Sequence, residues 1–305
     1  MGCLFGGLLH RAGHDVTLID VSVAQIAAIN EAGLILERGG ETLTLRIPAA
    51  LAADVGVAPE LVVLFTKTLH SEAALESIRG LIADDTILLS LQNGLGNEEV
   101  MARFVPRARI VQGVTTFPAD LVAPGHVHSV GFGHSQIMSL DGLVTPRLES
   151  IRVALDDAGL ECEISPEVAT AIWEKVAFNA ALNTLTAVTR LRIGSIADSP
   201  EATDLARRVA EEVVEVANRK GIGARKEVVL ATIAGALAEH REHQPSMLQD
   251  VLAGRRTEVG SLNGAVVREA EAIGLRVPFT EALYLLVRTL EAAIPGDSAA
   301  RLDRP

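Results

Sequence analysis

Three polar side chains interrupt an otherwise apolar stretch that ends at Asn183. Lys175, Asn179 and Asn183 follow one another at intervals of four residues. In a helix this spacing places an amine and two carboxamides on one face, in a stripe about 12 Å long. An ammonium can donate a proton and stabilise a developing negative charge, and carboxamides both donate and accept hydrogen bonds. The stripe indicates a site for a small polar substrate, although a solvent-reaching lysine beside two structural asparagines would give the same pattern.

The elements that must hold this stripe are helical. From Ser165 onward the apolar periodicity is that of helices, and Ser165-Pro166-Glu167 is a plausible helix start. Further helices are expected at about 200–220, 225–242, 247–273 and 278–293, followed by a loose tail at 296–305. The sequence therefore predicts a helical, substrate-binding domain over 165–305.

Residues 1–164 instead alternate between helical and strand patterns, which is typical of an α/β domain. A helix over about 2–12 precedes a buried strand at 15–20 that ends in Asp20. This order matches the second half of a dinucleotide-binding unit, in which an acidic residue takes the ribose hydroxyls. Gly2 would be the last glycine of that fingerprint. We predict a Rossmann-like, doubly wound domain whose first strand and earlier glycines lie upstream of this sequence; alternatively, Met1 is the true start.

Polar loops follow three further buried strands, expected at 61–65, 86–91 and 110–116. These loops contain Lys67, Asn93-Gly94 and Thr115-Thr116. In an open α/β sheet ligands bind outside the carboxyl ends of the strands, so we expect the three loops to line one cleft. Residues 125–140 are expected to form a hairpin. The strand at 161–164 would then end the domain.

Composition excludes several classes of protein. The net charge is -12 and no basic run is present, which argues against a nucleic-acid partner. No apolar run is long enough to span a membrane. Two cysteines, Cys3 and Cys162, fit a cytoplasmic protein. The histidines at 126, 128 and 134 have no carboxylate or cysteine at ligand spacing, so we predict no metal site.

Several motifs together resemble those of the ketopantoate reductase (2-dehydropantoate 2-reductase) family, over essentially the whole chain. The specific matches are Trp173-Glu174-Lys175 with Asn179 and Asn183, Pro245-Ser246-Met247-Leu248-Gln249-Asp250, and Arg256-Thr257-Glu258 followed by Asn263-Gly264. Gln92-Asn93-Gly94 and Gly113-Val114-Thr115-Thr116 are less specific and fall in the expected order.

The resemblance implies an enzyme of pantothenate biosynthesis that reduces 2-dehydropantoate to pantoate with NADPH. It makes Lys175 the general acid and places Glu258 against substrate and cofactor. The remaining roles it implies are substrate binding by Asn93, Asn179, Asn183 and Ser246, and cofactor binding by Lys67, Asn93, Ala119 and Glu258, in addition to Gly2 and Asp20 from the dinucleotide-binding pattern. The partners implied are a small 2-oxo acid and a second copy of the chain in a homodimer.

Three positions depart from the family pattern. Ile193 replaces an asparagine, Thr184 replaces a proline, and Asp20 stands where many members have a basic residue for the 2′-phosphate of NADPH. A carboxylate there accepts hydrogen bonds from ribose hydroxyls and repels a phosphate, which favours NADH. Two alternatives therefore stay open: a reductase of another branched 2-oxo acid, and a cofactor-free binding protein if the phosphate loop is genuinely absent.

Overall fold

The computed structural model describes residues 1–294, so the expected tail lies outside the described residues. The fold is a Rossmann-like α/β unit followed by a helical domain. The chain divides into one compact unit made of residues 1–92 and 97–168 and a second made of residues 93–96 and 169 onward. The expected boundary at 164 falls close to the second of these divisions. Residues 93–96 pack with the helical unit although they lie far before it in the sequence.

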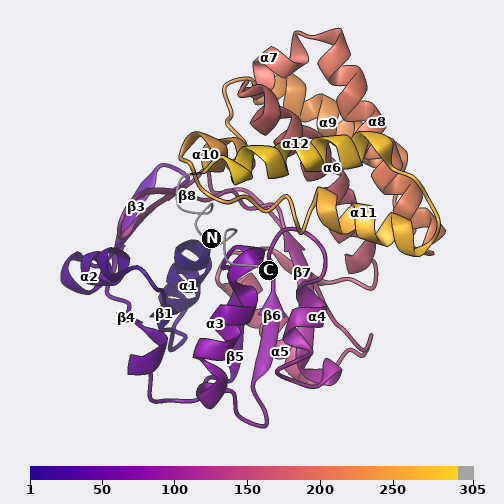
Figure 1. Ribbon diagram of the computed structural model, residues 1–305. Coiled ribbons are helices and arrows are strands. Elements are labelled where there is room, and N and C mark those ends of the chain that lie inside the picture. Colours follow the sequence, from indigo (N-terminus) through magenta and orange to yellow (C-terminus); the bar gives the residue numbers. More distant parts are fainter. Residues whose placement is uncertain (295–305) are drawn as a thin grey trace, which may run out of the picture. The chain divides into compact units, whose positions relative to one another are not determined.

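Five strands form the main sheet of the α/β unit, in the order β11-β10-β7-β6-β5. The strands β5 (Leu61–Leu64), β6 (Ile87–Ser90) and β7 (Ile110–Thr115) are parallel neighbours, and Figure 1 shows them with α3 and α4 on the near face. Their continuous apolar sequences suit strands that are covered on both faces. The strand β10 (Ser135–Ser139) runs antiparallel to β7, and β11 (Cys162–Ile164) runs parallel to β10.

Two smaller sheets complete this unit, and they correct two predictions. The strand expected at 15–20 is only β1 (Leu18–Ile19), which pairs with β4 (Ala49–Ala50). Residues 125–140 do not form a hairpin, because β9 (His126–Ser129) joins the order β3-β2-β9-β8 while β10 joins the main sheet. The remaining strands are β2 (Leu34–Arg38), β3 (Glu41–Leu45) and β8 (Asp120–Ala123). Gly131, at φ +93°, lies in the loop that carries the chain from one sheet to the other.

The first helix packs closely on the small sheets because glycines face them. A Cβ atom on Gly6 would lie 2.5 Å from Leu18 Cδ2, and one on Gly7 would lie 3.0 Å from Leu34 Cδ2. The helices of this unit are α1 (Gly2–Arg11), α2 (Val23–Ala32), α3 (Ser71–Ser77), α4 (Asn97–Met101) and α5 (Pro146–Asp157). Single 3₁₀ turns lie at η1 (Ala52–Asp54), η2 (Thr68–His70), η3 (Arg79–Leu81) and η4 (Arg107–Arg109). The helix α3 is thus short, and Ile78 separates it from η3.

The second unit is helical throughout, with the long helix α6 (Val168–Thr189) contributing much of its core. Its other helices are α7 (Ile193–Ala197), α8 (Pro200–Arg219), α9 (Lys226–Glu239), α10 (Ser246–Leu252), α11 (Asn263–Ala272) and α12 (Pro278–Ala292). The prediction of a single helix at 247–273 was wrong, because residues 253–262 separate α10 from α11. Gly254, at φ +63°, supplies the left-handed backbone that ends α10. The segment that contains Glu258 is therefore a turn.

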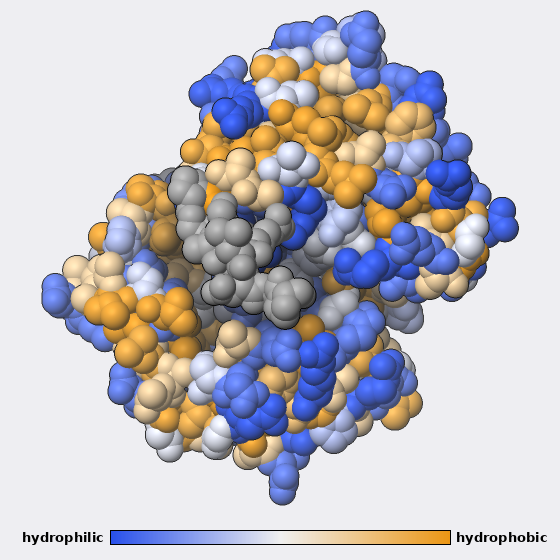
Figure 2. Space-filling model, viewed as in Figure 1, coloured by the Kyte–Doolittle hydropathy of each residue, from blue (hydrophilic) through white to orange (hydrophobic). Residues whose placement is uncertain are grey.

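The surface of the helical unit carries an apolar region, which Figure 2 shows where α12 lies. On this helix Leu285 is 55% exposed and Leu286 is 48% exposed. The expected homodimer stays a prediction, which the mass of the protein in solution tests. Within residues 1–294 no helix is both long and apolar enough to cross a bilayer.

Candidate functional site

The polar stripe of α6 lies at the edge of the helical core, as its spacing predicted. Lys175 is half-buried, and Asn179 and Asn183 are 7% and 6% exposed. Their neighbours Val176 and Ala180 fill the core. Among residues 1–294, no hydrogen bond joins the carboxamide of Asn179 or of Asn183 to the protein. Because buried polar groups need partners, the two carboxamides are suited to a ligand.

Two opposing effects set the pKa of the Lys175 amine. Desolvation lowers its pKa from 10.5 to about 8, and the carboxylate of Glu258 acts in the opposite direction by favouring the charged form. The adjacent Glu174 bonds elsewhere, since its carboxylate accepts hydrogen bonds from the backbone N–H and the Nε–H of Arg225 at 2.9 and 2.8 Å. Lys175 can therefore gain or lose a proton near neutral pH, with Glu258 as the charged group that tunes it.

A closed turn presents Glu258. The Glu258 carbonyl accepts hydrogen bonds from the backbone N–H of Ser261 and of Leu262, both at 3.1 Å, and from Ser261 Oγ at 3.0 Å. On the other side, Thr257 Oγ1 accepts a hydrogen bond from the backbone N–H of Val259 at 3.2 Å. Both neighbours of Glu258 are thus fixed by local bonds, which restricts where its carboxylate can point.

The segment 93–96 joins this turn and brings Asn93 into the helical unit. The backbone N–H of Leu95 donates to the Ser261 carbonyl at 2.9 Å. A Cβ atom on Gly94 would lie 2.6 Å from the same carbonyl oxygen, and the φ of Gly94 is +88°. Only glycine fits here without strain, because both the space and the backbone conformation exclude a side chain. Asn93, which is half-buried, therefore lies next to the contact that joins its loop to the turn of Glu258.

Ser246, the remaining predicted substrate residue, lies outside the polar stripe of α6. So do Ile193 and Thr184, which depart from the family pattern. Ser246 is the exposed first residue of α10, and no described contact joins it to Lys175. Ile193 is 2% exposed and belongs to the helical core. Thr184 Oγ1 donates a hydrogen bond to the carbonyl of Ala180. The same carbonyl also accepts a hydrogen bond from Asn263 Nδ2 at 3.2 Å. The two departures are therefore packed inside the unit.

Four predicted cofactor residues lie in the α/β unit, each at the end of an element. Gly2 is the first residue of α1, Asp20 follows β1, Lys67 follows β5, and Ala119 directly precedes β8. Asp20 is exposed, and its Oδ1 accepts a hydrogen bond from the backbone N–H of Ser22 at 2.9 Å. A Cβ atom on Gly2 would make only an ordinary contact, at 3.8 Å from Phe65 Cβ. Protein packing therefore does not demand glycine at Gly2.

Two of the three predicted strand-end loops are tied to one another within this unit. The Nε2 of Gln92, after β6, donates to Ser71 Oγ at 2.7 Å and to Thr66 Oγ1 at 3.2 Å. The parallel strands β5 and β6 thus have bonded loops at their carboxyl ends, the edge at which open α/β sheets bind ligands. Lys67 lies in this region, directly after Thr66.

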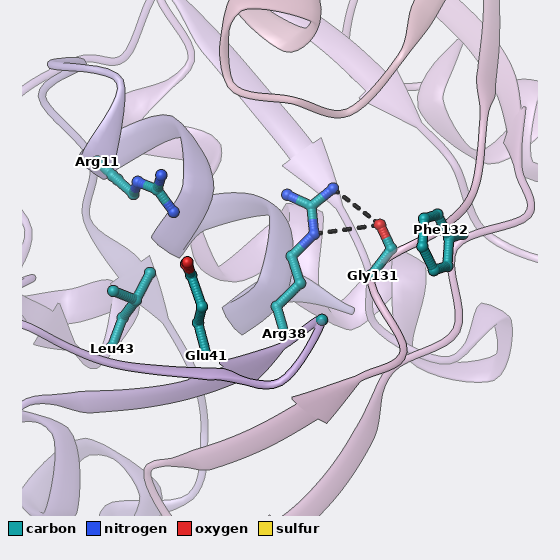
Figure 3. A pocket seen from close by; sticks show the side chains of 7 residues that line it. Arg11, Arg38, Glu41, Leu43, Gly131 and Phe132 are labelled. Atoms are coloured by element: carbon teal, nitrogen blue, oxygen red, sulfur yellow. Dashed lines mark hydrogen bonds between the residues drawn. The ribbon is translucent and has the colours of Figure 1, made fainter.

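The α/β unit also contains a cavity of about 290 Å³ that includes none of the predicted residues, shown in Figure 3. Its lining is Arg11, Arg38, Gly39, Glu41, Leu43, Gly131 and Phe132. Arg38 Nη2 donates to the carbonyls of Gly131 at 3.1 Å and Gly159 at 2.7 Å. The guanidinium therefore serves to join β2 to two loops, and we assign the cavity no ligand.

Two of the three histidines weighed as metal ligands lie beside separate carboxylates. His126 Nε2 lies 2.9 Å from Glu37 Oε1, and His134 Nε2 lies 3.7 Å from Glu163 Oε1. No group of three or more metal-ligating side chains occurs in the described part of the chain.

Two residues that hold the turn of Glu258 were not predicted individually from the sequence. Thr257 lies inside a recognised motif, but its bonds depend on a turn where a helix was expected. Glu291, in the last turn of α12, is buried and binds Thr257 at 2.7 Å. No local signal marks it, because a glutamate near a helix end is usually solvated.

Comparison with known proteins places this geometry in context. Residues 1–142 match the family model described as "Ketopantoate reductase PanE/ApbA", and residues 167–291 match the one described as "Ketopantoate reductase PanE/ApbA C terminal". The 2-dehydropantoate 2-reductase of Pyrococcus horikoshii is 34% identical over 96% of this chain and 95% of its own. That of Streptococcus pyogenes serotype M1 is 30% identical over 96% of both chains.

Solved structures agree on the fold. A D-mandelate dehydrogenase in ternary complex with NADH and anilino(oxo)acetate superposes with a TM-score of 0.90, at 29% identity, over 95% of both chains. A PanE/ApbA family ketopantoate reductase from Ralstonia eutropha JMP134 superposes with a TM-score of 0.86, at 30% identity, over 95% of this chain and 94% of its own.

Proposed function

This chain belongs to the ketopantoate reductase family, and on that premise we propose that it reduces the ketone of a small 2-oxo acid, with 2-dehydropantoate as the first candidate substrate. The observation that carries the proposal is that the carboxylate of Glu258 favours the charged form of Lys175. On the same helix face as Lys175, two carboxamides have no protein hydrogen bonds among the described residues. An acid with a lowered pKa beside open donors and acceptors suits carbonyl reduction.

A nicotinamide dinucleotide held by the cofactor residues would supply the hydride for the carbonyl carbon. The protein residues manage the charge that this transfer creates on oxygen. Lys175 stabilises the alkoxide and gives it a proton, and Glu258 favours the protonated amine before transfer. Asn179 and Asn183 hold substrate oxygens through their carboxamides, and Ser246 offers a hydroxyl to the substrate carboxylate. Asn93 completes the substrate side from the loop bonded to Ser261.

On the cofactor side we propose Gly2, Asp20, Lys67, Asn93, Ala119 and Glu258 as contacts. NADPH follows from the family, whereas the exposed carboxylate of Asp20 favours NADH. An acid at the end of this strand accepts bonds from both ribose hydroxyls and repels a 2′-phosphate. The D-mandelate dehydrogenase structures contain NADH, which supports the second choice for a protein of this fold.

A second candidate substrate is another branched or aromatic 2-oxo acid. Ile193 favours it, because its side chain is packed in the core and cannot hydrogen-bond the hydroxyl of a pantoate skeleton. The similarity to D-mandelate dehydrogenase, whose complex holds an aromatic oxo acid analogue, points the same way.

Initial rates separate these candidates. The purified protein is assayed with NADH and with NADPH against 2-dehydropantoate, branched aliphatic 2-oxo acids and phenyl-substituted 2-oxo acids. A higher kcat/KM for 2-dehydropantoate supports the first substrate, and a higher value for another acid supports the second. Oxidation of neither cofactor with any acid would sink the reductase proposal. Calorimetry with both cofactors tests the binding-protein alternative, which tight binding of either one removes.

A further inference from the structure

A buried carboxylate lies against the turn that carries Glu258, on a helix outside the recognised motifs. Glu291, in the last turn of α12, is 3% exposed. Its Oε1 accepts hydrogen bonds from the backbone N–H and from the Oγ1 of Thr257, both at 2.7 Å. Its Oε2 accepts one from Arg288 Nη1 at 2.7 Å. Both carboxylate oxygens are therefore bonded, and one of them holds the residue that directly precedes Glu258.

Burying a carboxylate is costly unless its oxygens are fully bonded, so this arrangement calls for an explanation. Hydrogen bonds to an ionised acceptor are shorter and about twice as strong as neutral ones. Two such bonds from one oxygen fix both the backbone and the side chain of Thr257. Thr257 in turn holds the backbone N–H of Val259, so both neighbours of Glu258 are set by one chain of bonds that starts at Glu291.

We infer that Glu291 is a positioning residue: it holds Thr257, and thereby the turn that presents the Glu258 carboxylate to Lys175. The catalytic meaning of this inference rests on the proposed function, while the positioning itself does not. All the groups involved lie in the helical unit, where α12 can be followed in Figure 1. A role in stability alone predicts a different result, namely a weaker fold with an unchanged relation between Glu258 and Lys175.

The effect of removing a charge near the turn must be distinguished from the effect of removing the hydrogen bonds that hold it. Arg288 lies on α12, the Arg255–Asp250 pair lies just before the turn at 3.1 Å, and Arg256 is part of the turn. Replacing Glu291 with alanine removes a negative charge as well as two bonds to Thr257. Glu291→Gln removes the same charge but keeps an oxygen that can accept both bonds. Thr257→Val removes the hydroxyl bonds without any change of charge.

The chain offers a matched control at the other end of the same helix. The Glu212 carboxylate, from α8, accepts hydrogen bonds from the backbone N–H of Phe279 at 3.0 Å and of Thr280 at 2.8 Å, and from Thr280 Oγ1 at 2.7 Å. This is the same kind of clamp on a threonine, in the first turn of α12, with no bond to the turn of Glu258. Glu212→Ala should therefore weaken the fold without affecting Lys175.

The test measures the protonation of Lys175 directly in the full chain. The rate at which acetic anhydride modifies Lys175 is followed against pH by peptide mass spectrometry, with the modification of Lys220 and Lys226 as internal references. Glu258→Gln should move the Lys175 midpoint to lower pH, because it removes the charge that raises this pKa. Glu291→Ala should move it in the same direction by about half a pH unit or more, and Thr257→Val should also move it. Glu291→Gln should move it less than Glu291→Ala.

An unchanged Lys175 midpoint in both Glu291→Ala and Thr257→Val would overturn the inference, as would equal shifts in Glu291→Ala and Glu291→Gln, which indicate charge alone. If Glu291→Ala does not fold, Thr257→Val and Glu291→Gln decide. The measurement needs neither substrate nor cofactor. A protein that reduces no 2-oxo acid would therefore overturn the proposed function while this result remained readable.

Discussion

The carboxylate of Glu258 favours the charged form of Lys175 and opposes the burial that lowers the pKa of this lysine to about 8. The two residues come from different elements, a turn after α10 and the middle of α6. An amine with this pKa holds a proton at neutral pH and can also release it. Both are needed by a group that donates a proton in reduction and accepts it in the reverse reaction.

Replacing Lys175 should remove proton donation while sparing the cofactor. We expect Lys175→Ala to lower kcat by about 10²- to 10⁴-fold, because the variant lacks the ammonium that stabilises the developing alkoxide and supplies its proton in the proposed reaction. The dissociation constant of the reduced cofactor, measured by fluorescence titration, should change little. Lys226→Ala is the control, since Lys226 is an exposed lysine of α9. A kcat for Lys175→Ala equal to that of the control would return Lys175 to a structural role.

The pH dependence of reduction should report the same amine. In the proposed mechanism the ketone oxygen takes its proton from Lys175, so kcat/KM for reduction should fall as pH rises through about 8. Glu258→Gln removes the influence that raises this pKa, and the fall should then begin at lower pH. Rates between pH 6 and 10, with a substrate and cofactor that the wild-type protein accepts, check this. A fall at the same pH in both proteins would argue against the coupling.

Stability should depend on pH through Lys175 in a direction that follows from its lowered pKa. Between about pH 8 and 10.5 the unfolded chain binds the Lys175 proton and the folded chain has released it. The unfolded state then carries more protons, so the free energy of unfolding contributed by this group rises with pH, by at most about 3 to 4 kcal/mol. Lys175→Met should lack this rise. Urea unfolding at pH 7.5 and pH 10 measures the difference, and parallel changes in both proteins would contradict it.

Cofactor choice should respond to the acid after β1. We expect Asp20→Arg to shift the ratio of NADPH to NADH affinity toward NADPH, because an arginine attracts the 2′-phosphate that a carboxylate repels. Asp15→Arg makes the same change of charge at an exposed position before β1 and is the control. Affinities measured by calorimetry at one fixed salt concentration decide. Equal shifts in the two variants would show that Asp20 does not face the ribose.

Local patterns predicted the elements whose residues depend on their own neighbours in sequence. Alternating and continuous apolar runs located β5, β6 and β7, and the period of 3.6 located α6 with its polar stripe. Predictions failed where distant contacts decide. Residues 247–273 have a helical pattern, yet Gly254 and the bonds within 257–262 break the helix. Residues 125–140 look like a hairpin, yet their two strands pair with different sheets.

The amino-acid sequence by itself determined the fold class and the face on which Lys175, Asn179 and Asn183 lie, because helix geometry makes residues four apart neighbours. Only the tertiary structure decided which charge meets Lys175. Glu258 reaches it because a turn replaces a helix, Gly94 lets residues 93–96 close on Ser261, and Glu291 holds Thr257 from α12. Such contacts join segments far apart in the chain, and their energies depend on burial and bond geometry that no local spacing encodes.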